Sequence, residues 1–130
     1  MPVELKYVDD SNGIEMIGTG MVTGEQIYNG FEEYYSGDML LKTKYLIANF
    51  LDVEYFNVSN EDVIRIADQE IQASKTGLKR LFALVGEQDF IFGLLRMWEA
   101  HTFRSGFETM VFRDRDKALT WINEKMAYGK

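Results

Sequence analysis

The stretch YLIANFL, residues 45–51, is almost continuously apolar, with Asn49 as its one polar residue. A run this short and this apolar is typical of a strand that helices cover on both faces of a parallel sheet. Residues 81–85, LFALV, have the same character and end at Gly86, a residue type that favours turns. We therefore predict that these two runs lie side by side as inner, parallel strands.

Strands near both ends of the chain complete the predicted sheet. Residues 3–8 alternate apolar and polar side chains, residues 9–13 supply turn chemistry, and the alternation resumes over residues 14–22. This pattern predicts a β-hairpin. Residues 107–112 are a third, shorter apolar run, which predicts the last strand.

Capping chemistry marks the starts of three predicted helices. Thr23 is followed three residues later by Gln26, the pattern of a capping box, and Ser59 stands in the same relation to Asp62. Asp114 is expected to cap the last helix. The buried faces of the four predicted helices are Ile27, Phe31 and Tyr34; Val63, Ala67 and Ile71; Ile91, Leu94, Leu95 and Trp98; and Leu119, Ile122 and Met126.

Strands and helices therefore alternate along the chain after an initial hairpin. Such alternation requires right-handed crossovers between parallel strands. We expect a single α/β domain over residues 1–130, with a mixed, mostly parallel central sheet of about five strands, an N-terminal hairpin and about four helices. We expect the strands of this sheet to be parallel to one another, apart from the first one or two.

The composition narrows the classes of function. The chain has 21 acidic and 14 basic residues, a formal charge of −7, so its averaged field repels nucleic-acid phosphates and anionic lipid surfaces. It has no cysteine, which excludes disulfides, thiolate metal sites and cysteine nucleophiles. No stretch is apolar enough for a membrane span, and the first residues do not have the pattern of a signal peptide. These features predict a cytoplasmic protein with no nucleic-acid partner and no membrane span.

No group of residues has the spacing of a catalytic or metal site. The one histidine, His101, falls in the last turn of a predicted helix, where a cation has a structural role; a general base or metal ligand is the alternative. The acidic pairs lie at helix starts, on diverging helix faces or in the hairpin turn, and none has the spacing of a calcium-binding loop. These pairs are Asp9 and Asp10, Glu32 and Glu33, Glu61 and Asp62, and Asp114 with Asp116. We therefore expect no catalytic residues, no metal and no cofactor.

Three stretches resemble a known family. Residues 111–122, VFRDRDKALTWI, resemble the closing strand and helix of the STAS-like domains related to the sporulation anti-sigma-factor antagonist, often called SpoIIAA-like. Residues 20–25, GMVTGE, are similar to that family's passage from its second strand into its first helix, and residues 84–86, LVG, to the end of its fourth strand. With the order of elements, the resemblance covers nearly the whole chain. It implies the family's fold and, by analogy, a regulatory module that binds proteins.

The resemblance also implies a phosphorylation site in the loop after the central strand. The family's Asp-Ser-Ser-Gly signature falls on residues 57–60, Asn-Val-Ser-Asn, so Val58 occupies the usual phosphoacceptor position and Ser59 is the serine that remains. A phosphate there would lie at a helix N-terminus, where the helix dipole favours an anion, and it would exclude a partner. The alternative is that Ser59 only caps the helix, with Val58 and Val63 forming a hydrophobic staple.

Two functional hypotheses follow. The first is a non-enzymatic module that binds a regulatory protein, such as an anti-sigma-type regulator, through the exposed starts of the first two helices. The residues expected to contact this partner are Thr23, Glu25, Asn57, Val58, Ser59, Asn60 and Asp62. The alternative is a site for a lipid-like or other apolar small molecule between helices and sheet, as in related lipid-exchange folds. Its expected residues are Trp98, Phe103, Tyr28 and Tyr35, since the chain has more aromatic residues than one small core holds if all are fully buried; an ordinary aromatic-rich core is the other interpretation. A homodimer through an aromatic surface is a further expectation.

Overall fold

One five-stranded sheet in the order β1-β2-β3-β4-β5 forms the centre of the molecule. The computed structural model describes residues 2–128. The strands are β1 (Val3–Val8), β2 (Gly13–Thr23), β3 (Tyr45–Asn57), β4 (Leu81–Val85) and β5 (Glu108–Phe112). β1 is antiparallel to β2, and all other neighbours are parallel. The predicted pairing of the two apolar runs is confirmed, because Tyr45 lies opposite Leu81 and Asn49 opposite Val85 in a parallel register.

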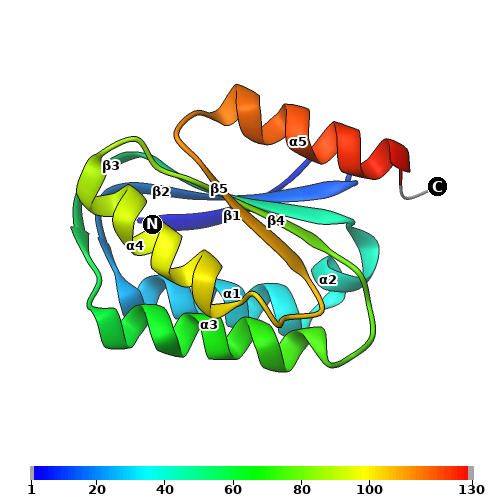
Figure 1. Ribbon diagram of the computed structural model, residues 1–130, viewed down its shortest axis with the longest axis horizontal. Coiled ribbons are helices and arrows are strands. Elements are labelled where there is room, and N and C mark those ends of the chain that lie inside the picture. Colours follow the sequence, from blue (N-terminus) through cyan, green and yellow to red (C-terminus); the bar gives the residue numbers. More distant parts are fainter. Residues whose placement is uncertain (1, 129–130) are drawn as a thin grey trace.

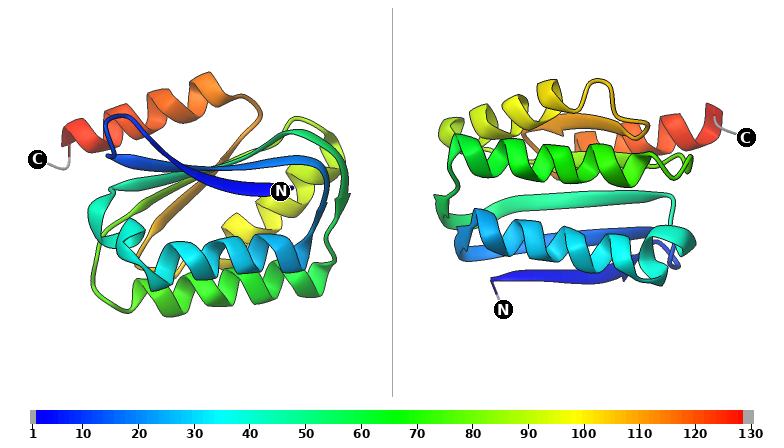
Figure 2. Two further views of the ribbon diagram at one scale, coloured as in Figure 1. Left: turned by 180° about the vertical axis from the view of Figure 1, so that it is seen from behind. Right: turned by 90° about the horizontal axis from the view of Figure 1, so that it is seen from below.

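In the described part of the chain, five helices cover the two faces of this sheet unequally. They are α1 (Gly24–Ser36), α2 (Asp38–Lys42), α3 (Asn60–Ser74), α4 (Asp89–His101) and α5 (Arg115–Tyr128). The helices α1 to α4 lie on one face and α5 lies alone on the other (Figures 1 and 2). The short α2 is the one helix that the sequence patterns did not predict, since five residues are too few to show a helical period.

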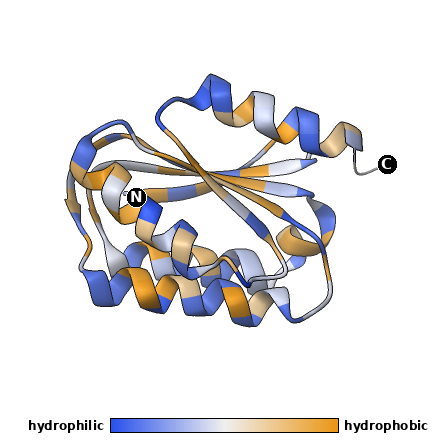
Figure 3. Cartoon of the chain, viewed as in Figure 1, coloured by the Kyte–Doolittle hydropathy of each residue, from blue (hydrophilic) through white to orange (hydrophobic). Residues whose placement is uncertain are grey.

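The larger core lies under α1, α3 and α4. Phe31, on α1, is fully buried and its ring centroid lies 5.4 Å from that of Trp98 and 5.8 Å from that of Phe82. These rings join α1, α4 and β4 into one cluster. In Figure 3 the central strands are mainly hydrophobic, whereas the helices alternate hydrophobic and hydrophilic bands, as expected of elements with one buried face.

Two helix faces differ from their predictions, since on α5 Ile122 is buried but Leu119 and Met126 are only half-buried, and α3 differs further. On α3, Val63 and Ala67 are buried as expected, but Ile71 is only half-buried and its neighbour Glu70 has no exposed surface. The buried face of α3 therefore includes a charged residue at position 70, which the sequence analysis did not name although it lies seven residues after Val63, on the same side of the helix. Glu70 finds hydrogen-bond partners on α4 and β5, which the sequence pattern does not reveal.

The smaller core explains why the inner strands are apolar on both sides. Ala118 and Ile122, on α5, pack with Ile47 and Val85 on the face of the sheet opposite to α1 and α3. Asp114 caps α5 as predicted, because its Oδ1 accepts a hydrogen bond from the Lys117 N–H at 2.8 Å. Each inner strand is therefore enclosed by helices on both faces.

The strands β2 and β3 extend well beyond the end of β4. The last paired residue of β4, Val85, lies opposite Asn49, so the remaining residues of β3, as far as Asn57, have only β2 as a neighbour. The register between β2 and β3 shifts twice, and Gly20 has a φ of 63°, a conformation that favours glycine. This long two-stranded extension projects the starts of α1 and α3 past the rest of the sheet.

Candidate functional site

The starts of α1 and α3 lie side by side at the carboxyl edge of the sheet. The ends of β2 and β3 are adjacent and parallel, and Thr23 lies opposite Asn57 in their register. Each strand continues directly into a helix, so the two helix N-termini emerge at the same edge. This arrangement brings together the residues predicted to contact a protein partner. We call Met21, Thr23, Glu25, Tyr55, Asn57, Ser59, Asn60 and Asp62 the carboxyl-edge surface; Val58, which was also predicted to contact a partner, is buried in the larger core instead.

Both helix starts are held by complete capping boxes, as predicted. The Thr23 N–H donates to Gln26 Oε1 at 2.9 Å, and the Gln26 N–H donates to Thr23 Oγ1 at 3.2 Å. At α3, the Ser59 N–H donates to Asp62 Oδ2 and the Asp62 N–H donates to Ser59 Oγ, both at 3.0 Å. Four backbone N–H groups that a helix start leaves without partners are thereby satisfied.

The two capping boxes also touch each other. A Cβ atom at Gly24 would collide with the Asp62 side chain, so any larger residue here would displace the carboxylate that caps α3. Beyond it, Arg65 Nη1 lies 2.6 Å from Glu25 Oε2, and the guanidinium lies 3.8 Å above the ring centroid of Tyr28. The surface is therefore a rigid one, formed by two helix ends in contact.

Ser59 and Val58 differ sharply in accessibility. Ser59 is exposed, with its hydroxyl oxygen occupied by the Asp62 N–H, whereas Val58 is 6% exposed and packs in the larger core with Val63. The residue at the family's phosphoacceptor position is thus a core residue in this chain. Ser59 is the one serine of this loop that an enzyme can reach.

Replacing Ser59 by alanine is expected to destabilise the native state by about 1 kcal/mol, because Ala leaves the Asp62 N–H without its capping acceptor. Replacing it by aspartate, which is also a good N-cap residue, is expected to restore most of this loss. Urea unfolding of both variants measures the effect. Equal stability of Ser59→Ala and the wild type would show that the cap contributes nothing.

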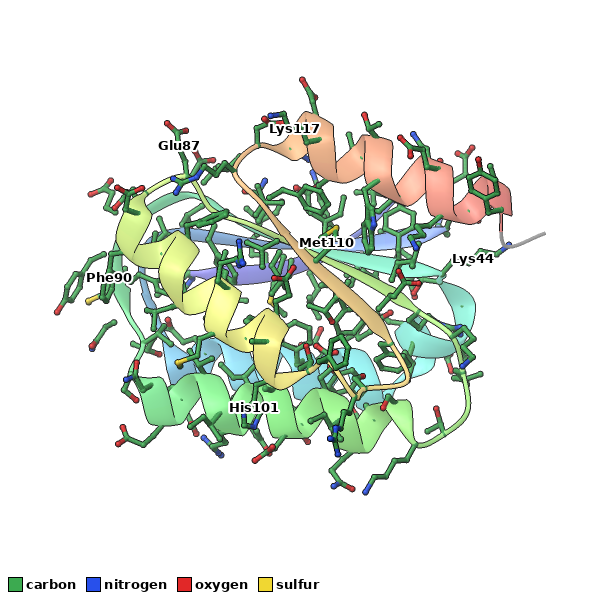
Figure 4. The ribbon with its side chains drawn as sticks, in the orientation of Figure 1. Lys44, Glu87, Phe90, His101, Met110 and Lys117 are labelled. Atoms are coloured by element: carbon green, nitrogen blue, oxygen red, sulfur yellow. The ribbon has the colours of Figure 1, made fainter. Side chains whose placement is uncertain are left out.

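Large apolar side chains are exposed at the same edge. Met21 and Tyr55, which are paired across β2 and β3, are 57% and 58% exposed, and Phe90, at the start of α4, is 64% exposed. Figure 4 shows Phe90 and Glu87 at this end of the molecule. Gln88 Nε2 donates to Val53 O at 3.3 Å, which fixes the start of α4 beside the extended β3. Apolar side chains gathered on a small protein's surface are typical of a binding site.

The charges around these apolar residues are predominantly negative. The elements of this edge carry seven acidic side chains, namely Glu25, Asp52, Glu54, Glu61, Asp62, Glu87 and Asp89. Two arginines lie among them, and each is already paired with a carboxylate, Arg65 with Glu25 and Arg113 with Asp89. The edge therefore presents apolar side chains within an acidic field.

The four residues predicted to bind an apolar molecule do not meet in one cavity. Trp98 is 2% exposed and Tyr35 packs against the larger core, so both serve the interior. Tyr28 lies in a shallow groove beside Arg65, and Phe103, which is 89% exposed, lines a different cavity at the other end of the sheet. The sequence analysis grouped them because they are aromatic. In the structure they lie in three different places: the larger core, the groove beside Arg65, and the cavity at the other end of the sheet.

His101 lies at the end of α4 with its Nε2 3.3 Å from Asp68 Oδ1. The ring is exposed, and its partner carboxylate is exposed on α3. Within residues 2–128, no cluster of three or more His, Asp or Glu side chains is arranged to hold a metal ion. The helices in this same range are all too short or too polar to cross a membrane.

Two buried carboxylates were missed by the sequence analysis. The first, Glu15 on β2, is 4% exposed and forms two hydrogen bonds with Arg115, from Nη2 at 2.7 Å and from Nε at 3.0 Å, while Asn49 Nδ2 donates at 2.9 Å. Burial by itself raises the pKa of Glu15, but the hydrogen bonds and charge of Arg115 outweigh it and hold this pKa below its usual value. The pair fastens the start of α5 to the sheet.

The second, Glu70 on α3, has no cation beside it. Trp98 Nε1 donates to its Oε1 at 3.1 Å and Thr109 Oγ1 donates to its Oε2 at 2.7 Å. Burial raises the pKa of Glu70 to about 7, and these neutral donors offset only part of that rise. The spacing of Glu70 from Val63 and Ala67 places it on the buried side of α3, but its charge argued against burial; no local signal identified Glu15.

A cavity of about 1040 Å³ lies at the opposite, amino end of β4 and β5. It is bounded by the loop between α4 and β5 and by the last turns of α5. In Figure 4, Met110 marks its wall on β5 and Lys44 lies at its outer end. Its lining comes from four separated parts of the chain, which is why the sequence analysis did not find it.

Comparison with known proteins identifies the fold. No protein-family model and no curated protein sequence matches the chain. Among solved structures, it is similar to the anti-sigma factor antagonist SpoIIAA in its unphosphorylated form, with a TM-score of 0.56 and 9% identity over 93% of this chain and 97% of that chain. It is also similar to an uncharacterized DUF3478 protein with a SpoIIAA-like fold from Shewanella loihica PV-4, with a TM-score of 0.54 and 15% identity over 92% of this chain and 90% of that one. The SpoIIAA-like fold implied by the sequence resemblance is thus confirmed.

Proposed function

We propose that this chain, which has the SpoIIAA-like fold, is a non-enzymatic regulatory module that binds a protein partner through the carboxyl-edge surface. The observation that carries the proposal is the exposure of Met21, Tyr55 and Phe90 beside two rigid helix starts. Exposed aromatic and Met side chains on a fixed scaffold are the residues that most often anchor a protein interface.

The charge of this surface indicates the chemistry of the partner. Seven acidic side chains surround the apolar residues, and the two arginines among them are already paired. A partner with basic residues around an apolar centre would be attracted, and an acidic one repelled. An anti-sigma-type regulator with such a surface is the partner class that we propose from the fold.

Phosphorylation of Ser59 is the proposed control of this contact. A phosphoryl group on Ser59 Oγ would lie at the start of α3, where the helix dipole favours an anion, and next to the Asp62 carboxylate. It would add charge and bulk in the centre of the surface, which would keep a partner's apolar side chains from it. Intact-mass spectrometry after incubation with the source organism's lysate and ATP tests this, with Ser59→Ala as the control. No mass gain that depends on Ser59 would remove the hypothesis.

A pair of exposed tyrosines tests the binding surface. Tyr55 lies in the carboxyl-edge surface, whereas Tyr128 lies at the end of α5 and is 88% exposed. In a pulldown from the native organism, Tyr55→Glu is expected to reduce recovery of the specific partner at least about tenfold, because it puts a charge in the apolar centre. Tyr128→Glu is expected to retain the partner. Equal loss with both variants, or recovery of no specific partner by the wild type, would contradict the proposal.

The predicted homodimer and cytoplasmic location remain predictions, whereas Trp98, Phe103, Tyr28 and Tyr35 lie too far apart in the fold to hold one apolar molecule together. Light scattering of the purified chain measures its molar mass and so shows directly whether it forms a dimer. A stable dimer that buries Tyr55 would identify a second copy as the occupant of the carboxyl-edge surface.

A further inference from the structure

The cavity at the amino end of β4 and β5 combines apolar and basic side chains. Its apolar lining residues are Leu81, Phe103, Phe107, Met110 and Met126. Its basic residues are Lys44, Lys79, Arg80 and Lys125, against two acidic residues, Glu99 and Glu108. An excess of cations here is notable because the chain as a whole has a formal charge of −7.

Within residues 2–128, three of these four cations form no ion pair, and one of the three, Arg80, is satisfied by backbone oxygens. Lys125 Nζ lies 2.8 Å from Glu108 Oε2, and the guanidinium of Arg80 donates to the backbone oxygens of Leu40 and Lys79. Within residues 2–128, no ion pair includes Lys44 or Lys79. Their ammonium groups are therefore available to an anion that enters the cavity.

The two free lysines lie together at one end of the cavity. Lys44 directly precedes β3 and Lys79 is two residues before β4, and the Leu81 N–H donates to Lys44 O at 3.2 Å. These neighbouring strand starts hold both lysines at the amino edge of the sheet. From there the lining continues along β5 to Met110 and to the loop that carries Phe103.

The apolar part of the lining is open to solvent. Phe103 is 89% exposed and Met110 is 41% exposed, although each has apolar neighbours in the cavity. Leaving such side chains in water is unfavourable, and covering them with an apolar molecule gains free energy in proportion to the area removed from water. Met110 and Met126 can adapt to irregular shapes because their side chains are flexible and polarizable.

We propose that this cavity binds an amphipathic anion, a small molecule with an apolar body and one negatively charged head group. Lys44 and Lys79 contact the head group, and Met110, Met126 and Phe103 cover the apolar body. The volume of about 1040 Å³ is at the upper end of ligand cavities and holds a chain of a dozen carbons with room to spare. A second copy of this protein fits poorly, because pairing two such cavities would set their free lysines against one another.

Titration of the ¹⁵N-labelled chain with dodecanoate below its micelle concentration tests the proposal. We expect saturable shifts of the amide signals of Leu81, Met110 and Met126. The double variant Lys44→Glu and Lys79→Glu is expected to bind dodecanoate about tenfold more weakly, because two attractive contacts become repulsive. Lys117→Glu, a matched change at the other end of α5 (Figure 4), is expected to bind within about twofold of the wild type.

A cationic probe of the same length separates charge recognition from simple apolar contact. Dodecyltrimethylammonium is expected to bind at least about tenfold more weakly than dodecanoate. Equal binding of the two probes would overturn the proposal, as would unchanged affinity of the double lysine variant. Tighter binding of an oligoglutamate peptide than of dodecanoate at the same residues would also overturn it, in favour of an acidic protein segment.

Discussion

Raising the pH from 5 to 8 is expected to destabilise the native state by about 2–3 kcal/mol through one side chain, Glu70. Its pKa is raised from 4.5 to about 7 by burial, so between these values the folded chain retains a proton that the unfolded chain releases. The contribution of Glu70 to stability is therefore full below pH 4.5, falls as the pH rises toward 7, and stays low above it.

The variant Glu70→Gln isolates this effect. Gln has the same shape, is neutral at every pH and still offers an acceptor to Trp98 or Thr109. In urea unfolding, its stability relative to the wild type is expected to rise by about 2–3 kcal/mol between pH 5 and pH 8. Glu61→Gln, an exposed change on the same helix, is the control and should show no such rise. Parallel pH profiles for Glu70→Gln and the wild type would contradict the assignment.

Replacing Arg115 by alanine is expected to cost about 2–3 kcal/mol of stability. Removing one partner of a buried ion pair leaves the other charge without compensation, a loss of about 3–5 kcal/mol in fully buried cases. The Glu15 side chain is 5% exposed but that of Arg115 is 39% exposed, so water replaces part of the lost contact and the expected cost is smaller.

Two further variants distinguish the loss of this pair from a general effect of removing an arginine. Arg113→Ala breaks an exposed pair with Asp89 and is expected to cost less than about 1 kcal/mol in the same urea experiment. Adding Glu15→Gln to Arg115→Ala removes the unpaired charge and is expected to recover part of the stability. A double variant no more stable than Arg115→Ala alone would show that the buried charge is not the cause.

The carboxyl-edge surface shows which parts of a site a sequence can predict. The capping boxes at Thr23 and Ser59 were predicted correctly, because each joins residues only three positions apart. Placing the two helix starts side by side at one edge needs the order of the strands, which the sequence did not predict and the structure shows. The contact of Gly24 with Asp62, and the exposure of Tyr55 on the extended β3, depend on the register of β2 and β3 and had no local signal.

The sequence by itself determined the strands, most of the helices, their caps and the absence of cysteine chemistry. These features depend on side-chain periodicity and on hydrogen bonds within one turn of chain. Only the tertiary structure decided that Glu70 and Glu15 are buried, that Trp98 and Phe103 lie in different environments, and that a cationic cavity exists. The physical reason is that burial and pKa depend on groups brought from distant parts of the chain, such as Arg115 to Glu15, and no short pattern records those distances.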